Sequence, residues 1–429
     1  MNEVLSRDLY QAYVNILQEE LVPAMGCTEP IALAYAAALA RRELGCIPQM
    51  VTVAVSPNII KNVKSVVVPH TGGLRGIQAA VAAGMVAGNA DKELEVLAEI
   101  TEADIPAISA WRDRTPITIT TSASGFLLDI DVTVAGDGHT ARVRLVGGHT
   151  NVVHVEKDGH VSLDLPCSEE QSAKLTDRSL LSVEHIITFA DQLDPDDVRQ
   201  ILQRQIDYNM AIAQEGLRGD YGANIGSILL QAYGDEVHNR AKAMAAAGSD
   251  ARMNGCELPV VINSGSGNQG LTASLPVVVY AKQMGATQTQ LYRALAVSNL
   301  VTIHIKTGIG KLSAFCGAVA AGVGAGAGVC YLHGGRYNEI SHTIVNAIAV
   351  DSGMICDGAK ASCAAKIASA VEAGLLGMEM QAHGTQFYSG DGIVTKGVEN
   401  NIRNIGALAR EGMRETDKTI IRMMTDGCC

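Results

Sequence analysis

The hydrophobic pattern of the sequence changes its period near residue 168, and this change constrains the fold more than any other feature. Between residues 116 and 165 apolar and polar side chains alternate, in the segments ITITT, FLLDIDVTV, ARVRLV, NVVHV and HVSLDL. The short connections between them all contain glycine. This pattern is typical of an antiparallel β-meander with one solvated face. Beyond residue 168 only residues 259–262 are predicted to form a strand.

Most of the remaining chain has the apolar spacing of helices. In the N-terminal part we expect helices over residues 8–20, 31–39 and 74–88, and a strand over residues 51–55. In the C-terminal part the expected helices span residues 183–214, 222–247, 291–301, 313–332, 341–350, 359–373 and 397–413. The sequence therefore predicts an α+β fold. An N-terminal domain of mixed helix and largely antiparallel sheet (1–170) precedes a mainly α-helical domain (171–429).

The charge balance excludes some classes of partner. The chain has 33 Lys+Arg against 45 Asp+Glu, for a formal net charge of −12, and it has no basic cluster. We therefore expect neither nucleic acid nor an anionic membrane surface as a partner. A small anionic substrate is compatible with this balance, because local groups can hold it.

The N-terminus carries no basic region followed by an apolar stretch, so no signal peptide is predicted and we expect a cytoplasmic protein. In a reducing cytoplasm cysteines are more often catalytic or metal-binding than paired in disulfides. Residues 312–335 lack charged side chains, but glycine and alanine dominate them. We interpret this stretch as a buried helix of a soluble protein rather than a membrane span. Helices with so few charges also suit a subunit interface, and we expect a homodimer.

Cysteines near the C-terminus form the first candidate site. Cys356 and Cys363 flank a break at Asp357-Gly358, so both thiolates can converge near a helix N-terminus that stabilises their charge. Cys316, followed by a small-residue helix, offers a third ligand of the same kind. Three cysteines predict a metal or cluster with one open position. Their spacing alone slightly favours ordinary small apolar side chains in alanine-rich helices, because C-x6-C is no standard zinc or ferredoxin signature.

The segment Gly26-Cys27-Thr28-Glu29-Pro30 precedes a predicted helix. A cysteine beside a helix N-terminus has a lowered pKa, so Cys27 is a candidate base, nucleophile or ligand. The same residues also suit a plain capping turn, with Thr28 as the N-cap and Cys27 packed inward.

Residues 263–270, NSGSGNQG, run from a predicted strand into an apolar helix. Their backbone N–H groups form a nest for a carboxylate, with Ser266, Asn268 and Gln269 as candidate substrate-binding residues. The segment lacks the Gly-Lys-Ser/Thr of a nucleotide-binding loop. The alternative is a glycine-rich connector without a ligand.

Two turns that pair histidine with threonine, PHTGG and GGHTN, lie at strand ends, where loops often supply site residues. Lys306, shortly before Cys316, is a candidate cation for a substrate carboxylate. These segments add the following candidate substrate-binding residues: Thr71, Gly72, His149, Thr150, Asn151 and Lys306.

Together, GCTEP, SGSGNQG and the spacing C316-x39-C356-x6-C363 resemble the L-cysteine desulfidase family, which is related to the iron–sulfur L-serine dehydratases. The resemblance covers nearly the whole chain. It implies a [4Fe–4S] cluster held by Cys316, Cys356 and Cys363, with one iron open to the substrate. Cys27 matches the family's fourth active-site cysteine, proposed as the base or as a temporary ligand of the open iron.

The resemblance predicts an iron–sulfur-dependent lyase that eliminates sulfide from L-cysteine, leaving pyruvate and ammonia, with Cys27 as the base. L-serine or another β-substituted amino acid is the nearest alternative substrate. A metal-binding or redox-sensing protein without catalysis is an alternative from another class. Related serine dehydratases fill the open iron with a C-terminal cysteine, and Cys428 or Cys429 is a minority candidate for that role.

Overall fold

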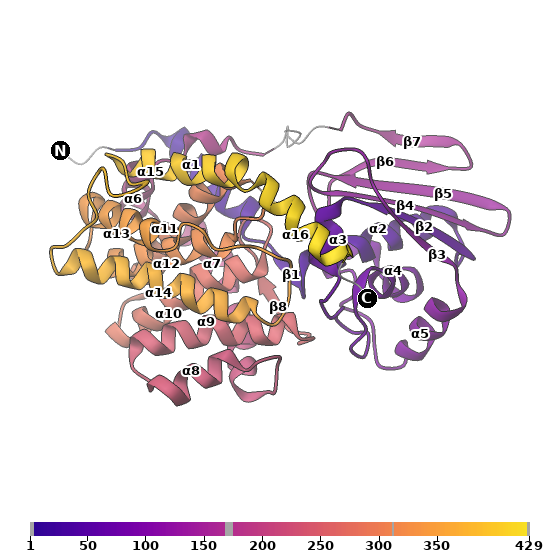
Figure 1. Ribbon diagram of the computed structural model, residues 1–429, viewed down its shortest axis with the longest axis horizontal. Helices are drawn as coiled ribbons and strands as arrows, with labels where there is room; N and C mark the ends of the chain where they lie inside the picture. The colour runs from indigo at the N-terminus through magenta and orange to yellow at the C-terminus, as the bar shows by residue number, and fades with distance from the viewer. Residues whose placement is uncertain (1–3, 168–174, 311–312, 427–429) are drawn as a thin grey trace.

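The computed structural model describes residues 4–167, 175–310 and 313–426. A sheet covered by helices on one face forms one part of the molecule, and a bundle of helices forms the other (Figure 1). The predicted α+β class, with a mainly helical C-terminal region, is confirmed. Cys428 and Cys429, the minority candidates for a ligand of the open iron, lie outside the described residues.

The N-terminal elements comprise the larger sheet, its covering helices, and the first helix and first strand, which pack with the helical part. They are α1 (Arg7–Glu20), β1 (Pro23–Met25), α2 (Thr28–Leu44), β2 (Met50–Val55), α3 (Pro57–Val63), α4 (Gly76–Ala87), α5 (Ile105–Arg114), β3 (Ile117–Thr121), β4 (Asp129–Gly136), β5 (His139–Val146), β6 (Val152–Lys157) and β7 (His160–Asp164).

The strands of the larger sheet lie in the order β3-β2-β4-β5-β6-β7. From β4 to β7 each strand pairs antiparallel with the next, which confirms the predicted meander for these strands. The prediction was wrong for the ITITT segment, because β3 pairs parallel with β2, with Val53 opposite Ile119. Parallel neighbours need a long crossover, and helices α3, α4 and α5 supply it.

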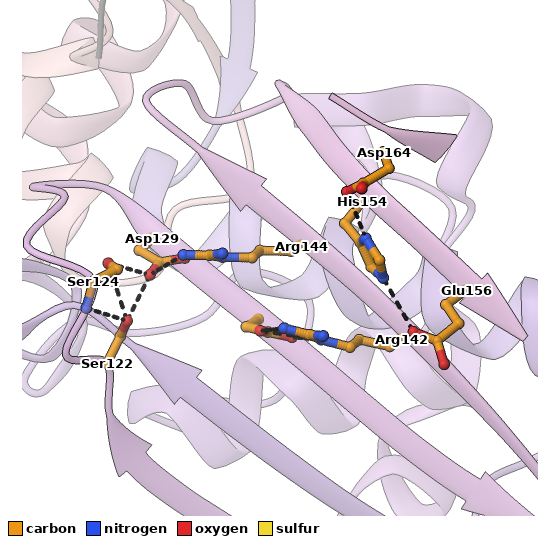
Figure 2. A network of polar contacts seen from close by, with 9 residues as sticks. Ser122, Ser124, Asp129, Arg142, Arg144, His154, Glu156 and Asp164 are labelled. Atoms are coloured by element: carbon orange, nitrogen blue, oxygen red, sulfur yellow. Dashed lines mark hydrogen bonds and ion pairs between the residues drawn. The ribbon is translucent and has the colours of Figure 1, made fainter. Parts of the chain in front are cut away.

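The two faces of this sheet differ in polarity. Buried residues such as Val53, Val132 and Val143 share a core with helices α2 and α4. The opposite face carries ion pairs across neighbouring strands, as Figure 2 shows. Arg144 Nε lies 2.8 Å from Asp129 Oδ1, and Arg142 Nη2 lies 2.6 Å from Asp131 Oδ2. A buried and a polar face on alternate residues account for the period-two pattern of the sequence.

The C-terminal elements are almost all helical. They are α6 (Val183–Gln192), α7 (Pro195–Arg218), α8 (Ile225–Tyr233), α9 (Val237–Met253), β8 (Pro259–Val261), α10 (Gly267–Met284), α11 (Gln288–Ile309), α12 (Gly317–Leu332), α13 (Tyr337–Val350), α14 (Cys363–Ala382), α15 (Val398–Ala407), a π-helical turn (Leu408–Gly412) and α16 (Arg414–Asp426).

Three of the predicted C-terminal helices are interrupted. The helix predicted over residues 183–214 ends before Asp194, which has extended backbone and caps α7 ahead of Pro195. The residue before a proline is disfavoured in the helical region, so the break follows from the sequence. Gly234, with φ 83°, separates α8 from α9. The π-helical turn separates α15 from α16 within the range predicted as 397–413.

Helix α12 lies in the centre of the bundle, as predicted for the glycine- and alanine-rich stretch. A Cβ added to Gly322 would lie 2.1 Å from the carbonyl oxygen of Ala370, and one added to Gly326 would lie 2.3 Å from that of Gly374. The backbones of α12 and α14 are therefore in direct contact. No helix in the described ranges is long and apolar enough to cross a membrane.

Elements close to the N- and C-termini join the two parts of the molecule. Strand β1 pairs antiparallel with β8, with Ala24 opposite Val260. Helix α16 reaches α3, where Lys61 Nζ lies 2.6 Å from Asp417 Oδ1 (Figure 1). Helix α1 packs into the core of the helical part. The domain boundary near residue 170 stays a prediction.

Candidate functional site

Four helix N-termini meet at one cavity of about 110 Å³ between the two parts. Cys27, Ser266 and Cys316 are the N-cap residues of α2, α10 and α12, and Cys363 is the first residue of α14. All four residues line the cavity. Because helix N-termini carry partial positive charge and free N–H groups, their convergence favours an anionic occupant.

A short backbone pairing places Cys316 beside Cys356. Phe315 and Ile355 form an isolated antiparallel bridge. The N–H of Cys316 donates to the carbonyl of Met354 (3.0 Å), and the N–H of Cys356 donates to that of Ala314 (2.6 Å). This pairing brings the two thiols into hydrogen-bond contact, although the cysteines are forty residues apart in the sequence.

The predicted break at Asp357-Gly358 is present, but the following helix starts later than expected. Gly358 has φ 89°, and a Cβ there would lie 2.3 Å from the carbonyl oxygen of Lys61. The predicted helix 359–373 is α14, which begins at Cys363 and ends at Ala382. Cys363 therefore lies at the helix N-terminus rather than one turn inside it.

The three thiols differ in their tendency to ionise. The hydrogen bond from Cys316, assisted by Lys61 and Lys306, holds the pKa of Cys356 below its usual value. The same hydrogen bond and burial raise the pKa of Cys316, and burial raises that of Cys363. The Cys316–Cys356 pair, with the two lysines beside it, therefore favours a thiolate at this position.

The cavity is cationic although the whole chain is acidic. Its lining contains the cations Lys61, Arg252, Lys306 and Lys366 and one carboxylate, Glu29. Lys306 is where the sequence predicted it, and burial lowers its pKa to about 8. An excess of cations supports thiolates and a negatively charged substrate group at this position.

The donor set fits an iron–sulfur cluster better than a single ion. Within the described residues no three His, Cys, Asp or Glu side chains form a ligand group for one metal ion. Cys316, Cys356 and Cys363 nevertheless line the same cavity. In a [4Fe–4S] cluster each thiolate binds a different iron, so the sulfurs need not converge on one point. Three thiolates leave one iron without a cysteine ligand.

The electrostatic prediction for Cys27 was wrong. Burial and the adjacent Glu29 carboxylate raise the pKa of the Cys27 thiol well above its usual value, and this outweighs the helix N-terminus. Cys27 itself is the N-cap of α2, and Thr28, predicted as the cap, is the first helical residue. Cys27 belongs to a small apolar cluster against which Cys363 packs.

Glu29 is a site residue that the sequence analysis quoted but did not single out. Its carboxylate is buried and lies 3.1 Å from each of Cys27 Sγ, Thr28 Oγ1 and Asn62 Nδ2. Burial raises its pKa, but His149 and the Cys27 thiol outweigh this and lower it overall. A carboxylate in the first turn of an otherwise apolar helix was the available signal, because such a group is rarely buried without partners.

The glycine-rich segment 263–270 enters the site as predicted, with Ser266, Asn268 and Gln269 in the lining. A Cβ on Gly270 would lie 2.0 Å from the carbonyl oxygen of Val261, so glycine lets α10 pack directly on β8. Thr28 Oγ1 donates to the carbonyl of Gly265 (3.0 Å) and links this segment to the turn that holds Cys27.

The two histidine–threonine turns do not line the cavity. Thr71 Oγ1 donates to the Val68 carbonyl, and Asn151 Nδ2 donates to the Val146 carbonyl, each at 2.7 Å within its own loop. Gly72 packs near Ile105, and Thr150 also lies outside the lining. His149 comes nearest, since a Cβ on Gly265 would lie 3.4 Å from its Cε1 atom. The structure therefore places four of these five predicted residues away from the site and one beside it.

The cysteine-lined cavity at the junction of an α+β part and a helical bundle agrees with the comparisons with known proteins. The chain belongs to the serine dehydratase alpha chain family, whose sequence profile matches residues 91–422. That range includes Cys316, Cys356, Cys363 and Arg252 but begins after Cys27. Membership indicates a dehydratase- or lyase-type enzyme, and this family is typically associated with iron–sulfur clusters.

Relatives match the chain over almost its full length. A UPF0597 protein of Desulfitobacterium hafniense is 57% identical over 98% of this chain and 97% of its own. A UPF0597 protein of Lachnoclostridium phytofermentans is 50% identical over 97% of this chain and 100% of its own. A UPF0597 protein of Aeromonas hydrophila is 41% identical over 98% of this chain and 100% of its own. These relatives also cover the N-terminal part that the family profile leaves out.

Proposed function

We propose that the chain is a carbon–sulfur lyase that converts L-cysteine and water to pyruvate, ammonia and hydrogen sulfide. The observation that carries this proposal is the presence of Cys27, Cys316, Cys356 and Cys363 in one cationic cavity, where the N-termini of α2, α10, α12 and α14 meet. Cytoplasmic location and a homodimer stay predictions.

Cys316, Cys356 and Cys363 are the residues that would hold a [4Fe–4S] cluster. When bound, a cluster with one iron free of protein ligands supplies a Lewis acid to the substrate. The partial positive charge of the helices that begin at Cys316 and Cys363 stabilises the thiolates. Lys61 and Lys306 act in the same direction.

The chain's own groups account for binding and proton transfer. The N-terminus of α10, with Ser266 and Asn268, holds the substrate carboxylate. Cys27, as the thiolate, removes the α-proton of the substrate, and the Glu29 carboxylate, 3.1 Å away, orients its sulfur. A thiolate whose thiol has a raised pKa is a stronger base. Hydrosulfide leaves as the α,β double bond forms, and the released aminoacrylate takes up water to give pyruvate and ammonia.

L-serine is the competing substrate, because the family description names a serine dehydratase. The same groups would remove the α-proton and release water in place of hydrosulfide. The cavity lining does not distinguish a thiol from a hydroxyl leaving group by any contact with the protein.

The test is anaerobic purification followed by iron analysis and turnover with L-cysteine and L-serine. We expect about four irons per chain and release of sulfide and pyruvate from L-cysteine. Cys363→Ala should lose iron and turnover. The matched control is Cys330→Ala on α12, a buried cysteine outside the cavity, which should keep both. A colourless zinc protein, or Cys363→Ala with full activity, contradicts the proposal. Turnover of L-serine alone reassigns the substrate.

A further inference from the structure

We infer that Arg252 and Gln269 recognise the two charged groups of an α-amino acid, with Arg252 binding the carboxylate and Gln269 Oε1 accepting from the ammonium. This inference rests on the proposed function insofar as the substrate is an amino acid. Both side chains line the cavity, and they are only 3% and 5% exposed. Within the described residues neither Arg252 Nε nor Gln269 Oε1 has a hydrogen-bond partner.

The protein holds the Arg252 side chain in place but leaves one of its hydrogen-bond donors without an acceptor. It lies in the last turn of α9, and its Nη1 donates to Asn268 Oδ1 at 3.1 Å. Its Nε packs against the start of α10, where a Cβ on Gly267 would come within 2.3 Å. Asn268 thus orients the guanidinium and leaves the Nε–H group unused. A buried guanidinium with a free donor is well suited to a carboxylate.

The other cations of the cavity are already engaged. Lys61 Nζ pairs with Asp417 Oδ1 at 2.6 Å, and Lys366 Nζ pairs with Asp357 Oδ1 at 2.5 Å. Lys306 Nζ donates to the carbonyl of Gly310. Among the cations of the described lining, Arg252 is the one with an orphaned side-chain donor.

Gln269 offers the complementary acceptor in the same cavity lining. Its amide lies against the start of α12, since a Cβ on Gly317 would be 2.7 Å from Oε1. The carboxylate of Glu29 is the competing acceptor for an ammonium group. Both of its oxygens already lie 3.1 Å from donors on neighbouring residues. The free Oε1 of Gln269 is therefore the better site for a new donor.

A carboxylate only accepts hydrogen bonds and an ammonium only donates them. One orphaned buried donor and one orphaned buried acceptor in the same cavity are complementary to a ligand that carries both groups. A simple anion would satisfy Arg252 and leave Gln269 without a partner. The pair thus suits a ligand that carries both a carboxylate and an ammonium group, as an α-amino acid does, and makes no contact that selects the β-substituent.

Other arginines show that an orphaned Nε is not sufficient to define a ligand site. Arg204 and Arg293 also leave Nε without a partner among the described residues, but they lie outside the cavity. Their side chains donate to the backbone carbonyls of Leu21 and Leu193. They therefore serve as matched controls, with the same unused atom and no route to the ligand.

The experiment measures binding to the purified protein by calorimetry, with three probes that lack a leaving group. L-alanine carries both charged groups, L-lactate lacks the ammonium, and L-alaninamide lacks the carboxylate. Arg252→Gln should weaken L-alanine and L-lactate by at least about tenfold and leave L-alaninamide unchanged. Gln269→Leu should weaken L-alanine and L-alaninamide and leave L-lactate unchanged. Arg204→Gln should change none of the three.

Arg252→Lys is the conservative variant if Arg252→Gln does not fold, and it should give an intermediate loss. Iron content and the unfolding midpoint of each variant separate loss of recognition from loss of structure. L-alanine binding that is unchanged in Arg252→Lys and Gln269→Leu overturns the inference. Wild-type protein that binds L-alanine no better than the other two probes also overturns it. Because no probe reacts, these outcomes are independent of whether L-cysteine or L-serine is cleaved.

Discussion

The thiol of Cys27 and the carboxylate of Glu29 are a hydrogen-bonded pair, with Sγ 3.1 Å from Oε2. Both residues are buried at the N-terminus of α2, where Cys27 is the N-cap and Glu29 lies in the first turn. Because of this pair, the helix N-terminus does not lower the pKa of Cys27. Its positive end stabilises the Glu29 carboxylate, and that carboxylate in turn raises the pKa of Cys27. Cys27 is therefore held as a thiol with an acceptor for its proton.

The first prediction concerns Glu29→Gln. Loss of the carboxylate should lower the pKa of the Cys27 thiol, because one cause of its rise is removed. It also removes the hydrogen-bond acceptor that orients Cys27 Sγ, so kcat should fall by about 10²-fold or more. The pH profile of kcat/KM should shift its acid limb to lower pH. Glu19→Gln, on α1 and outside the cavity lining, is the control and should match wild type in its pH profile. An unchanged pH profile in Glu29→Gln would exclude this pairing from the reaction.

The pairing of β1 with β8 explains why the site could be predicted only in pieces. GCTEP and SGSGNQG were each found as a turn before a helix. Their meeting depends on Ala24 lying opposite Val260. Strands of three residues have too little alternation to be recognised, and no local signal identifies partners more than two hundred residues apart. The three cysteines were grouped from the sequence as candidate ligands, but only the resemblance favoured a cluster over ordinary small apolar side chains.

Local sequence also could not say which turns face the cavity. PHTGG and GGHTN have the same glycine, histidine and threonine signals as a site loop. In the structure Thr71 and Asn151 satisfy carbonyls of their own loops. Arg252 had no signal at all, since an arginine in the last turn of a helix is ordinary. By contrast, Pro195 was a visible helix start that the prediction of a helix over 183–214 passed over.

The second prediction concerns the attachment of α16 to α3. Lys61 is almost fully buried and its partner Asp417 is nearly so, with side chains 2% and 15% exposed. Asp417→Ala leaves a buried charge without its partner and should cost about 3 kcal/mol of unfolding free energy. Glu415→Ala on the same helix removes an exposed pair with Lys418 and should cost much less. Urea unfolding of both variants measures the difference. Equal losses would mean that the buried pair does not anchor α16.

The third prediction tests the contact between α12 and α14. Gly322→Ala places a Cβ 2.1 Å from the carbonyl oxygen of Ala370, so the helices must separate. We expect a loss of about 3 kcal/mol. Gly308→Ala in α11 meets nothing closer than 3.6 Å and should be neutral or stabilising by up to about 1 kcal/mol. Thermal unfolding of the two variants distinguishes a packing requirement from a general intolerance of alanine. A Gly322→Ala protein as stable as wild type would contradict the close approach.

The last prediction concerns Asp250 and the pH dependence of stability. Asp250 is fully buried in α9, and its Oδ2 accepts from the N–H of Gly226 (3.0 Å) at the start of α8, while Oδ1 has no partner among the described residues. Burial raises its pKa from 3.8 to about 6. Because the folded pKa is the higher one, the folded state binds the proton more tightly. This contribution to stability is complete below pH 3.8 and is lost as the pH rises through about 6.

Asp250→Asn keeps an acceptor for Gly226 and cannot ionise. Its unfolding free energy relative to wild type should therefore rise by about 2 kcal/mol between pH 4.5 and pH 7. Urea unfolding at the two pH values measures this change. Asp113→Asn, at an exposed position on α5, is the control and should shift by less than about 0.5 kcal/mol. If the Asp250→Asn and wild-type curves stay parallel between these pH values, then Asp250 does not titrate with the raised pKa, and its cap on α8 is held by an ionised carboxylate.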